Sequence, residues 1–304
     1  MTLKNGFSII IPAFNEESNI GNLLQNLQTA LSKIHENCDI IVVDDGSTDN
    51  TCSMAGSVQG IKVMRNPYNK GNGAAVKAGI MEAKGEKLVI IDADGQHDPK
   101  YIPEMLNLLN EYDLVVGARE SFGVGRRGLG NLIVSKLASY LSGIPIPDLT
   151  CGFRAFKKDK MMEFVHLLPN GFSLPSTSTL AFAVNGYNIK FIPIQSQPRQ
   201  GGKSSVKVLR DGIKFAVLII RMVNLFKPLK VYFPVSVLLL IIGLFWSLKV
   251  YAVAKGISNL GTMLLLAGVL TFLFGLLADQ LAETRLSIGR ILKSRATETK
   301  EDID

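Results

Sequence analysis

Acidic residues stand directly after two short apolar runs in the first third of the chain. The run IIVV precedes Asp44 and Asp45, and the run LVII precedes Asp92 and Asp94. A short β-branched run that ends in carboxylates is typical of a buried parallel strand, which delivers the acids to the ligand-binding edge of an α/β sheet. Two carboxylates one residue apart suit Mg²⁺ or Mn²⁺, because these hard cations prefer oxygen ligands and bridge substrate phosphates. The chemistry indicated is metal-assisted binding of a nucleotide diphosphate.

The spacing of apolar residues predicts the elements that position these acids. Between residues 7 and 118, short apolar runs alternate with helical patterns. We expect strands at 7–11, 40–43, 61–64, 88–91 and 114–116, and helices around 18–33, 50–57, 72–83 and 99–110. Such alternation predicts an α/β fold with a mostly parallel sheet covered on both faces. Further strands at 151–156 and 189–194 would complete a catalytic domain over residues 1–205.

The first expected strand runs into the segment IIIPAFNEE. Pro12 cannot continue the hydrogen bonding of a central strand, so we expect the chain to turn there. The turn would expose Phe14, Asn15, Glu16 and Glu17 at the edge of the sheet.

The character of the chain changes after residue 205. Residues 206–230 carry basic residues on one helical stripe, which predicts an amphipathic helix in a membrane interface; an ordinary core helix is the alternative. The uncharged runs 231–248 and 256–278 are close to or above the roughly 20 residues that cross a bilayer. They predict a two-helix transmembrane hairpin over 231–280, and a buried helical pair in a soluble protein is the alternative.

Charge and composition narrow the partners. Basic residues flank both ends of the expected hairpin, so the positive-inside rule places both ends, and a charged tail at 281–304, in the cytosol. The net charge is +7, and the basic residues lie near apolar segments. This distribution favours an anionic membrane surface or phosphate substrates over nucleic acid. Three cysteines are too few for a disulfide framework or a zinc site, and no signal-peptide layout precedes the first strand. We therefore expect an integral membrane protein with a cytosolic catalytic domain; Gly268 and Gly275 would permit close helix contacts in a homo-oligomer.

A series of motifs, read in order, carries a family resemblance. The series is IPAFNEE, VVDDGSTD, NKGNGAA, IDADGQHDP, GAR, DLTCGFRAF and RQGGKSS. It resembles glycosyltransferase family 2 and, within it, the polyprenyl-phosphate glycosyltransferases such as dolichol-phosphate mannose synthases and undecaprenyl-phosphate sugar transferases. The resemblance covers about residues 6–225 and implies a GT-A nucleotide-sugar-binding fold.

The resemblance also implies roles for individual residues. The nucleotide-sugar site would consist of Pro12, Phe14, Glu16, Val43, Asp45, Asp92, Ala93, Asp94, Gln96 and Arg119, with Val43 and Asp45 at the base. Asp92, Asp94 and Gln96 would hold Mg²⁺ or Mn²⁺, and Arg119 would reach the phosphates. Residues that would hold the acceptor phosphate are Arg126, Arg127, Ser135, Arg199 and Lys207. The chain departs from the family at Asn131, where an Arg is frequent, and Arg126 and Arg127 would take over that role.

The segment GFSLPSTSTL lacks the acidic residue that many family members carry, so we assign no catalytic acid there. A lipid monophosphate is already anionic near pH 7, because its second pKa is about 6, and needs no strong base to attack the sugar. Catalysis would then rest on positioning and on stabilising the leaving diphosphate, with Asp94 and Arg119 as catalytic residues. Asp148 would act as a base, orient the acceptor, or only cap a turn.

These expectations combine into one function and two alternatives. The chain would move a hexose, with inversion, from a UDP- or GDP-sugar to a polyprenyl phosphate at the cytosolic membrane face. The first alternative is a family 2 transferase with another acceptor, such as a glycan or a diacylglycerol. The second is a non-catalytic membrane scaffold with a degenerate transferase domain. The residues do not distinguish uracil from guanine, because Asp45 could accept a hydrogen bond from either ring.

Overall fold

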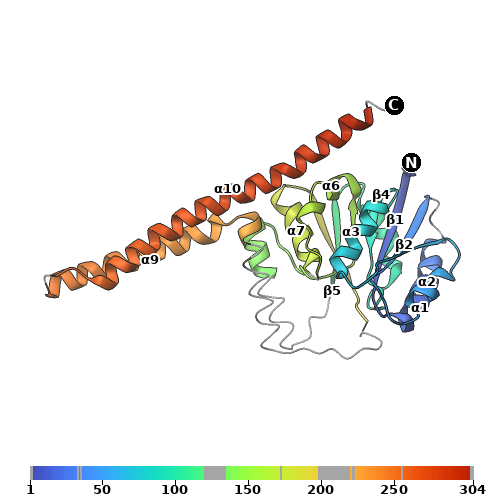
Figure 1. The fold of residues 1–304 in the computed structure, drawn as a ribbon, viewed down its shortest axis with the longest axis horizontal. Helices are drawn as coiled ribbons and strands as arrows, with labels where there is room; N and C mark the ends of the chain where they lie inside the picture. The colour runs from blue at the N-terminus through green and yellow to red at the C-terminus, as the bar shows by residue number, and fades with distance from the viewer. Residues whose placement is uncertain are drawn as a thin grey trace. The chain divides into compact units, whose positions relative to one another are not determined.

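The computed structural model describes residues 3–32, 34, 36–119, 135–171, 173–197, 220, 223–254 and 256–301. The chain divides into two compact units, residues 1–215 and 216–304. The first unit is an α/β domain and the second is a pair of long helices (Figure 1).

The α/β unit alternates strands and helices along the chain as the apolar spacing predicted. Its elements are β1 (Leu3–Ala13), α1 (Glu17–Leu31), β2 (Cys38–Asp44), α2 (Thr51–Gly56), β3 (Ile61–Arg65), α3 (Asn72–Glu82), β4 (Gly85–Ile90), η1 (Pro99–Tyr101), α4 (Ile102–Leu108), β5 (Leu114–Arg119), β6 (Arg154–Lys157), α6 (Lys158–Met162), η2 (Val165–Leu167), α7 (Leu174–Val184) and β7 (Ile189–Ile194). Residues 135–142 are also helical.

The strands form one sheet in the order β3-β2-β1-β4-β6-β5-β7. All neighbours are parallel except β6, which runs antiparallel between β4 and β5. Helix α3 packs against β1 and β2, and α1 lies beside α2 (Figure 1). Helix α1 also packs against α4. The central strands are therefore buried, and Phe7, Ile9 and Ile10 have no exposed surface. The mostly parallel α/β fold is confirmed.

Among the boundaries that differ from the sequence-based expectations, two affect the edge of the sheet that carries the acids. Strand β1 continues one residue past Pro12, where we expected the chain to turn. Ile91 N–H donates to the carbonyl oxygen of Ile10, so the backbone polar groups of alternate residues, Pro12 included, face β4. Pairing with β4 ends at Ile10, so the missing N–H of Pro12 removes no bond from the sheet.

The second difference concerns the strand expected at 151–156, which begins only at Arg154. Residues 151–153 lie outside the strand, and they bring the Gly152 Cα close to the carboxylate of Asp92. This segment therefore forms part of the ligand edge rather than of the sheet.

The helical unit contains α9 (Leu229–Ala254) and α10 (Asn259–Glu301). Both are long and apolar enough to cross a membrane, over Leu229–Val253 and Asn259–Arg285. Large apolar side chains such as Leu238, Phe245 and Phe274 are more than half exposed, which argues against a helical pair buried in a soluble core. The residues expected to form a tail continue as helix α10 as far as Glu301.

Glycines lie where α9 and α10 approach each other closely. A Cβ at Gly268 would lie 2.8 Å from Leu240 Cγ, and one at Gly275 would lie 2.7 Å from Tyr232 Cβ. These pairings run antiparallel, so the helices form a hairpin. Gly268 and Gly275 thus already serve contacts within one chain, and a homo-oligomer built on them stays a prediction.

Candidate active site

A cavity of about 630 Å³ lies where the parallel strands end. Polar side chains reach it from the segments after β1, β2 and β4 and from the end of β5. The expected nucleotide-sugar residues that line it are Pro12, Phe14, Glu16, Asp45, Asp92, Ala93, Asp94, Gln96 and Arg119. Val43 is the exception: it is buried within β2 and does not line the cavity, so its contact with a base stays a prediction.

The turn after β1 is cross-linked to the turn after β2. Asn15 has a positive φ of 55°, a conformation that Asn adopts more readily than most residues. Its N–H donates to Ser47 Oγ at 2.9 Å, and Thr48 N–H donates back to Asn15 Oδ1 at 2.9 Å. Glu16 N–H donates to Thr51 Oγ1 at 2.8 Å. These bonds fix the two turns that carry Phe14, Glu16 and Asp45.

The acids after β4 occupy a partly enclosed position. Asp92 Oδ1 lies 3.4 Å from Asn72 Nδ2, and Asp94 Oδ1 accepts from Gln96 N–H at 3.1 Å. Burial raises the pKa of Asp92 above its usual value. Burial first, and the charge of Asp92 second, raise the pKa of Asp94. A nearby cation would stabilise the ionised form of both buried carboxylates.

These residues fit a divalent cation. Asp92, Asp94 and Gln96 offer oxygen donors at the wall of one cavity. Within the described part of the chain, no three His, Cys, Asp or Glu side chains cluster to hold a metal by themselves. This agrees with Mg²⁺-type sites, which use one or two carboxylates and take their remaining ligands from substrate phosphates and water. Such a cation, when bound, supplies positive charge to a diphosphate.

Arg119 is held by Asp148. The Arg119 Nε–H donates to Asp148 Oδ2 at 2.7 Å, its Nη2 donates to Oδ1 at 3.1 Å, and Nη2 also donates to Thr150 Oγ1 at 2.7 Å. Asp148 is fully buried and does not line the cavity, whereas Arg119 does. Burial by itself raises the pKa of Asp148, but the bonds and charge of Arg119 outweigh burial, and the pKa lies below its ordinary value. This arrangement favours an orienting role for Asp148 over that of a base.

Two residues near the acids were not singled out from the sequence. A Cβ at Gly152 would overlap Asp92 Oδ2, so the absent side chain makes room for that carboxylate. Arg154 is fully buried and donates to the carbonyl oxygens of Cys151 and Pro175 and to Ser178 Oγ and Thr179 Oγ1. It therefore ties the loop around Gly152 to the start of α7. Both residues belong to the motif DLTCGFRAF, but only the fold shows what they contact.

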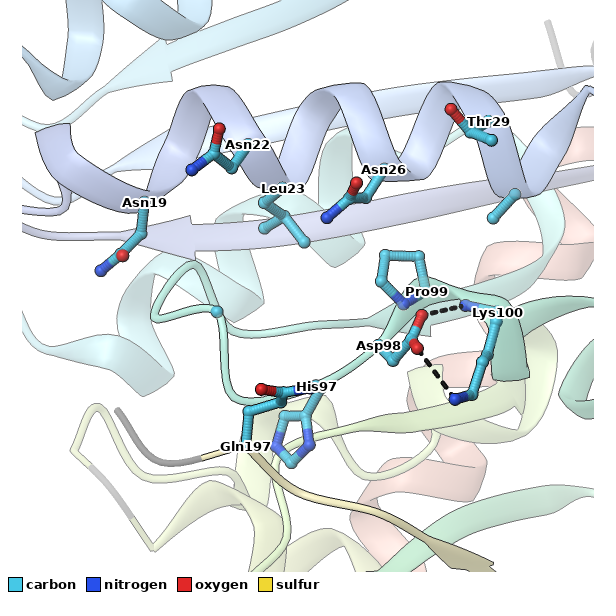
Figure 2. Close-up of a pocket in the computed structure, with 12 residues that line it drawn as sticks. Asn19, Asn22, Leu23, Asn26, Thr29, His97, Asp98, Pro99, Lys100 and Gln197 are labelled. Carbon is cyan, nitrogen blue, oxygen red and sulfur yellow. Dashed lines mark hydrogen bonds and ion pairs between the residues drawn. The ribbon is translucent and has the colours of Figure 1, made fainter. Parts of the chain in front are cut away.

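A second cavity lies on the other side of the loop that carries Asp94 and Gln96. It is a polar groove of about 510 Å³ between α1 and the segment from Gly95 to Lys100. Figure 2 shows side chains that line it, including Asn22 and Asn26 of α1. Asp98 caps η1 by accepting from Lys100 N–H at 3.0 Å, and Lys100 Nζ pairs with its other oxygen. His97 lines both this groove and the cavity at the ends of the parallel strands.

The side chain of His97 packs beneath the loop that carries Asp94 and Gln96. Its ring stacks on Phe153 with centroids 5.4 Å apart, and its Nε2 lies 4.0 Å from Cys151 Sγ. Burial lowers the pKa of His97 to about 4, so the imidazole is neutral at physiological pH. Its position supports packing of the loop rather than metal ligation.

The expected acceptor-phosphate residues are only partly covered by the structure. Ser135 is buried, and its Oγ accepts from Leu149 N–H at 3.3 Å, one residue from Asp148. Arg126, Arg127, Arg199 and Lys207 lie outside the described residues, as does most of the expected amphipathic helix.

Fold and cavity together define a class of protein. A mostly parallel sheet that presents a pair of acids and an arginine to one cavity is the GT-A arrangement of nucleotide-sugar-binding transferases. Glucosyl-3-phosphoglycerate synthase from Mycobacterium tuberculosis, solved with Mn²⁺, UDP and phosphoglyceric acid, has this fold: it superposes with a TM-score of 0.58 at 19% identity, over 72% of this chain and 78% of that chain. At this identity the likeness shows the fold alone.

The chain belongs to glycosyl transferase family 2, whose model matches residues 8–164. A second model, the GtrB C-terminal hairpin, matches residues 227–284.

The names of three relatives each contain a dolichol or dodecaprenyl phosphate. A dolichol-phosphate mannosyltransferase of Pyrococcus furiosus is 35% identical over 179 residues, 55% of this chain and 50% of the relative. A dodecaprenyl-phosphate galacturonate synthase of Rhizobium johnstonii is 32% identical over 173 residues, 52% of this chain and 51% of the relative. A dolichyl-phosphate hexose transferase of Haloferax volcanii is 29% identical, over 66% of this chain and 92% of the relative. The matched region thus spans about half the length of the first two relatives.

Proposed function

We propose that this chain transfers one hexose from a UDP- or GDP-sugar to a polyprenyl phosphate at the cytosolic face of a membrane. The observation that carries the proposal is the convergence of Asp92, Asp94 and Arg119 on one cavity, in a chain that continues into an apolar hairpin. The names of the relatives support the lipid phosphate acceptor. The GT-A neighbours bound to Mn²⁺ or Mg²⁺ with UDP support a metal-assisted diphosphate site.

In a single displacement at the anomeric carbon, the residues of the cavity would have separate roles. Phe14, 42% exposed at the cavity wall, offers a face on which a base can stack. Asp92, Asp94 and Gln96 would hold the divalent cation, which supplies charge to the diphosphate. Arg119, oriented by Asp148 and Thr150, adds positive charge where the leaving group develops negative charge.

The displacement requires no strong base. An oxygen of the lipid monophosphate forms a bond to the anomeric carbon while the bond from that carbon to the diphosphate oxygen breaks, so the configuration inverts. The attacking oxygen is already anionic, and no proton must be removed. This agrees with the observation that Asp148, the acid considered as a base, is engaged by Arg119.

The test is Asp94→Ala, assayed with membranes, polyprenyl phosphate and radiolabelled donors. The donors to compare are UDP-glucose, UDP-galactose, UDP-N-acetylglucosamine and GDP-mannose. We expect turnover of the preferred donor to fall about 100- to 1,000-fold, because one group that stabilises the leaving diphosphate is lost, while membrane insertion is unchanged. Glu104→Gln, which removes an exposed carboxylate from α4, is the matched control.

The alternatives give different results. Near-normal turnover in Asp94→Ala would contradict the proposed role of the acids. Transfer to a soluble glycan or a diacylglycerol, and not to lipid monophosphate, would favour another family 2 acceptor. Absent or Mn²⁺-independent binding of every nucleotide sugar would favour a non-catalytic scaffold.

A further inference from the structure

A segment that precedes α7, residues 168–171, is bonded to helix α3. Lys77 of α3 donates from Nζ to the carbonyl oxygen of Leu168 at 3.0 Å and also to Asn170 Oδ1. Ala74 N–H donates to the carbonyl oxygen of Asn170 at 3.0 Å. The partners of Lys77 lie 91 and 93 residues further along the chain. The segment is therefore tied to α3 both by a side chain and by the backbone.

Glycines at the start of α3 allow the segment to lie directly on the helix. A Cβ at Gly71 would overlap the carbonyl oxygen of Asn170, and a Cβ at Gly73 would overlap that of Pro169. Gly71 also has a φ of 102°, which favours glycine. The two backbones are thus in direct contact, so a shift of residues 168–171 either moves the start of α3 or opens a gap beside it.

The ammonium group of Lys77 is used for this contact. Its side chain is partly buried, although lysine normally keeps its charged end in water. Among the described residues it forms no ion pair, and its hydrogen bonds go to two neutral oxygens of the segment. Hydrogen bonds from a charged donor are stronger than those between neutral groups. Lys77 is therefore the main side-chain link between α3 and residues 168–171.

This link connects two walls of the cavity at the ends of the parallel strands. Both α3 and α7 contribute residues to that cavity. Arg154 donates to the carbonyl oxygen of Pro175 at 2.7 Å and so fixes the start of α7. Lys77 fixes the segment that leads into α7 on α3. The two contacts together tie the walls to each other across the cavity.

The walls from α3 and α7 carry no charge. Their cavity-lining residues are Asn72, Ala75, Val76, Leu174 and Pro175. In the proposed function, the base stacks on Phe14, and the diphosphate uses the charged groups after β4 and at the end of β5. The uncharged walls remain for the hexose, because an amide and several apolar side chains can contact its hydroxyls and its ring.

We propose that Lys77 is a positioning residue for the hexose of the donor. By holding residues 168–171 on α3, it fixes the spacing of the two uncharged walls and so the position of the anomeric carbon. Lys77 does not itself line the cavity, so it acts through these two segments rather than by touching the donor. The inference rests on the proposed function, because it assumes that the cavity binds a nucleotide sugar.

The experiment compares Lys77→Met with the unaltered, detergent-purified full chain. Transfer to polyprenyl phosphate is measured with the preferred of the four donors above. Binding of UDP or GDP, whichever that donor contains, is measured by calorimetry with Mn²⁺ present. We expect kcat to fall about tenfold, because the anomeric carbon is displaced from the attacking oxygen. We expect affinity for the diphosphate to stay within twofold, because the base and diphosphate contacts are unchanged.

Lys62→Met is the matched control, because Lys62 pairs with Glu82 near the other end of α3. We expect its kcat and its diphosphate affinity to match those of the unaltered chain. Unchanged transfer in Lys77→Met, or an equal loss of diphosphate affinity, would overturn the inference while the transferase function of the unaltered chain stands. If the unaltered chain transfers no hexose, the proposed function fails and the inference with it.

A second variant tests the contact without removing a charge. Asn170→Ala deletes one acceptor of Lys77 at an exposed position. We expect kcat to fall about threefold, and the double variant to be no slower than Lys77→Met alone, because both changes act through one contact. Additive losses would refute the shared contact. If Lys77→Met does not fold, Asn170→Ala decides, and unchanged transfer in it refutes the inference.

Discussion

Gly152→Ala would displace an acid of the cavity by adding a single methyl group. The new Cβ would overlap Asp92 Oδ2 and lie 3.0 Å from Asp92 Cγ. Gly152 does not have a positive φ, so the backbone itself tolerates alanine. The strain falls on the carboxylate, which is the far end of a rotatable side chain.

The size of the effect follows from contact distances. A methyl carbon and an oxygen approach to no less than about 3.2 Å, so Asp92 Oδ2 must move by about 1 Å. A displacement of this size in a positioning group can reduce turnover about 100-fold. Because the carboxylate can rotate away from the methyl group, we expect the fold to survive.

The assay combines three measurements on the detergent-purified chain: sugar transfer, Mn²⁺ dependence of transfer, and thermal unfolding. For Gly152→Ala we expect turnover to fall about 100-fold and the Mn²⁺ requirement to rise, with little change in melting temperature. Gly56→Ala is the matched control, because a Cβ at the exposed end of α2 meets no atom within 4 Å. Turnover within twofold of the unaltered chain, with an unchanged Mn²⁺ titration, would refute the view that Asp92 must hold its observed position.

Two further predictions concern the segment that follows Asp148. Arg154→Met leaves buried acceptors at Cys151, Pro175 and Ser178 without their donor. We therefore expect the free energy of unfolding to fall by about 2–4 kcal/mol, as measured by denaturant titration followed by circular dichroism. An unchanged midpoint would contradict the role of Arg154 in holding this segment in place. Burial raises the pKa of the Cys151 thiol to about 12, so the thiolate is scarce at pH 8. Iodoacetamide should then modify the partly exposed Cys52 and spare Cys151 in the folded chain, as mass spectrometry would show; equal labelling of both would disprove the burial argument.

Local patterns in the sequence were enough to predict the alternating elements, the mostly parallel sheet and the two apolar helices. They succeed because strand and helix periodicities are set by neighbours along the chain. The acids at the ends of β2 and β4 were also predictable, since the carboxyl ends of parallel strands share one edge. Pro12 was misjudged because its effect depends on where the adjacent strand β4 stops, which the segment itself does not encode.

Tertiary structure decided which of these groups touch. Arg119 was expected to reach phosphates, but only the fold shows that it is bound by Asp148, 29 residues away. Likewise, only the fold shows that the Asp45 carboxylate accepts hydrogen bonds from Asn66, Lys70 and Gly71. Gly152 becomes meaningful only because β6 returns antiparallel beside β4 and brings the preceding loop against Asp92. The sequence therefore determines the types and order of the chemical groups. Which of them contact each other depends on strand order and on loops that bring distant segments together.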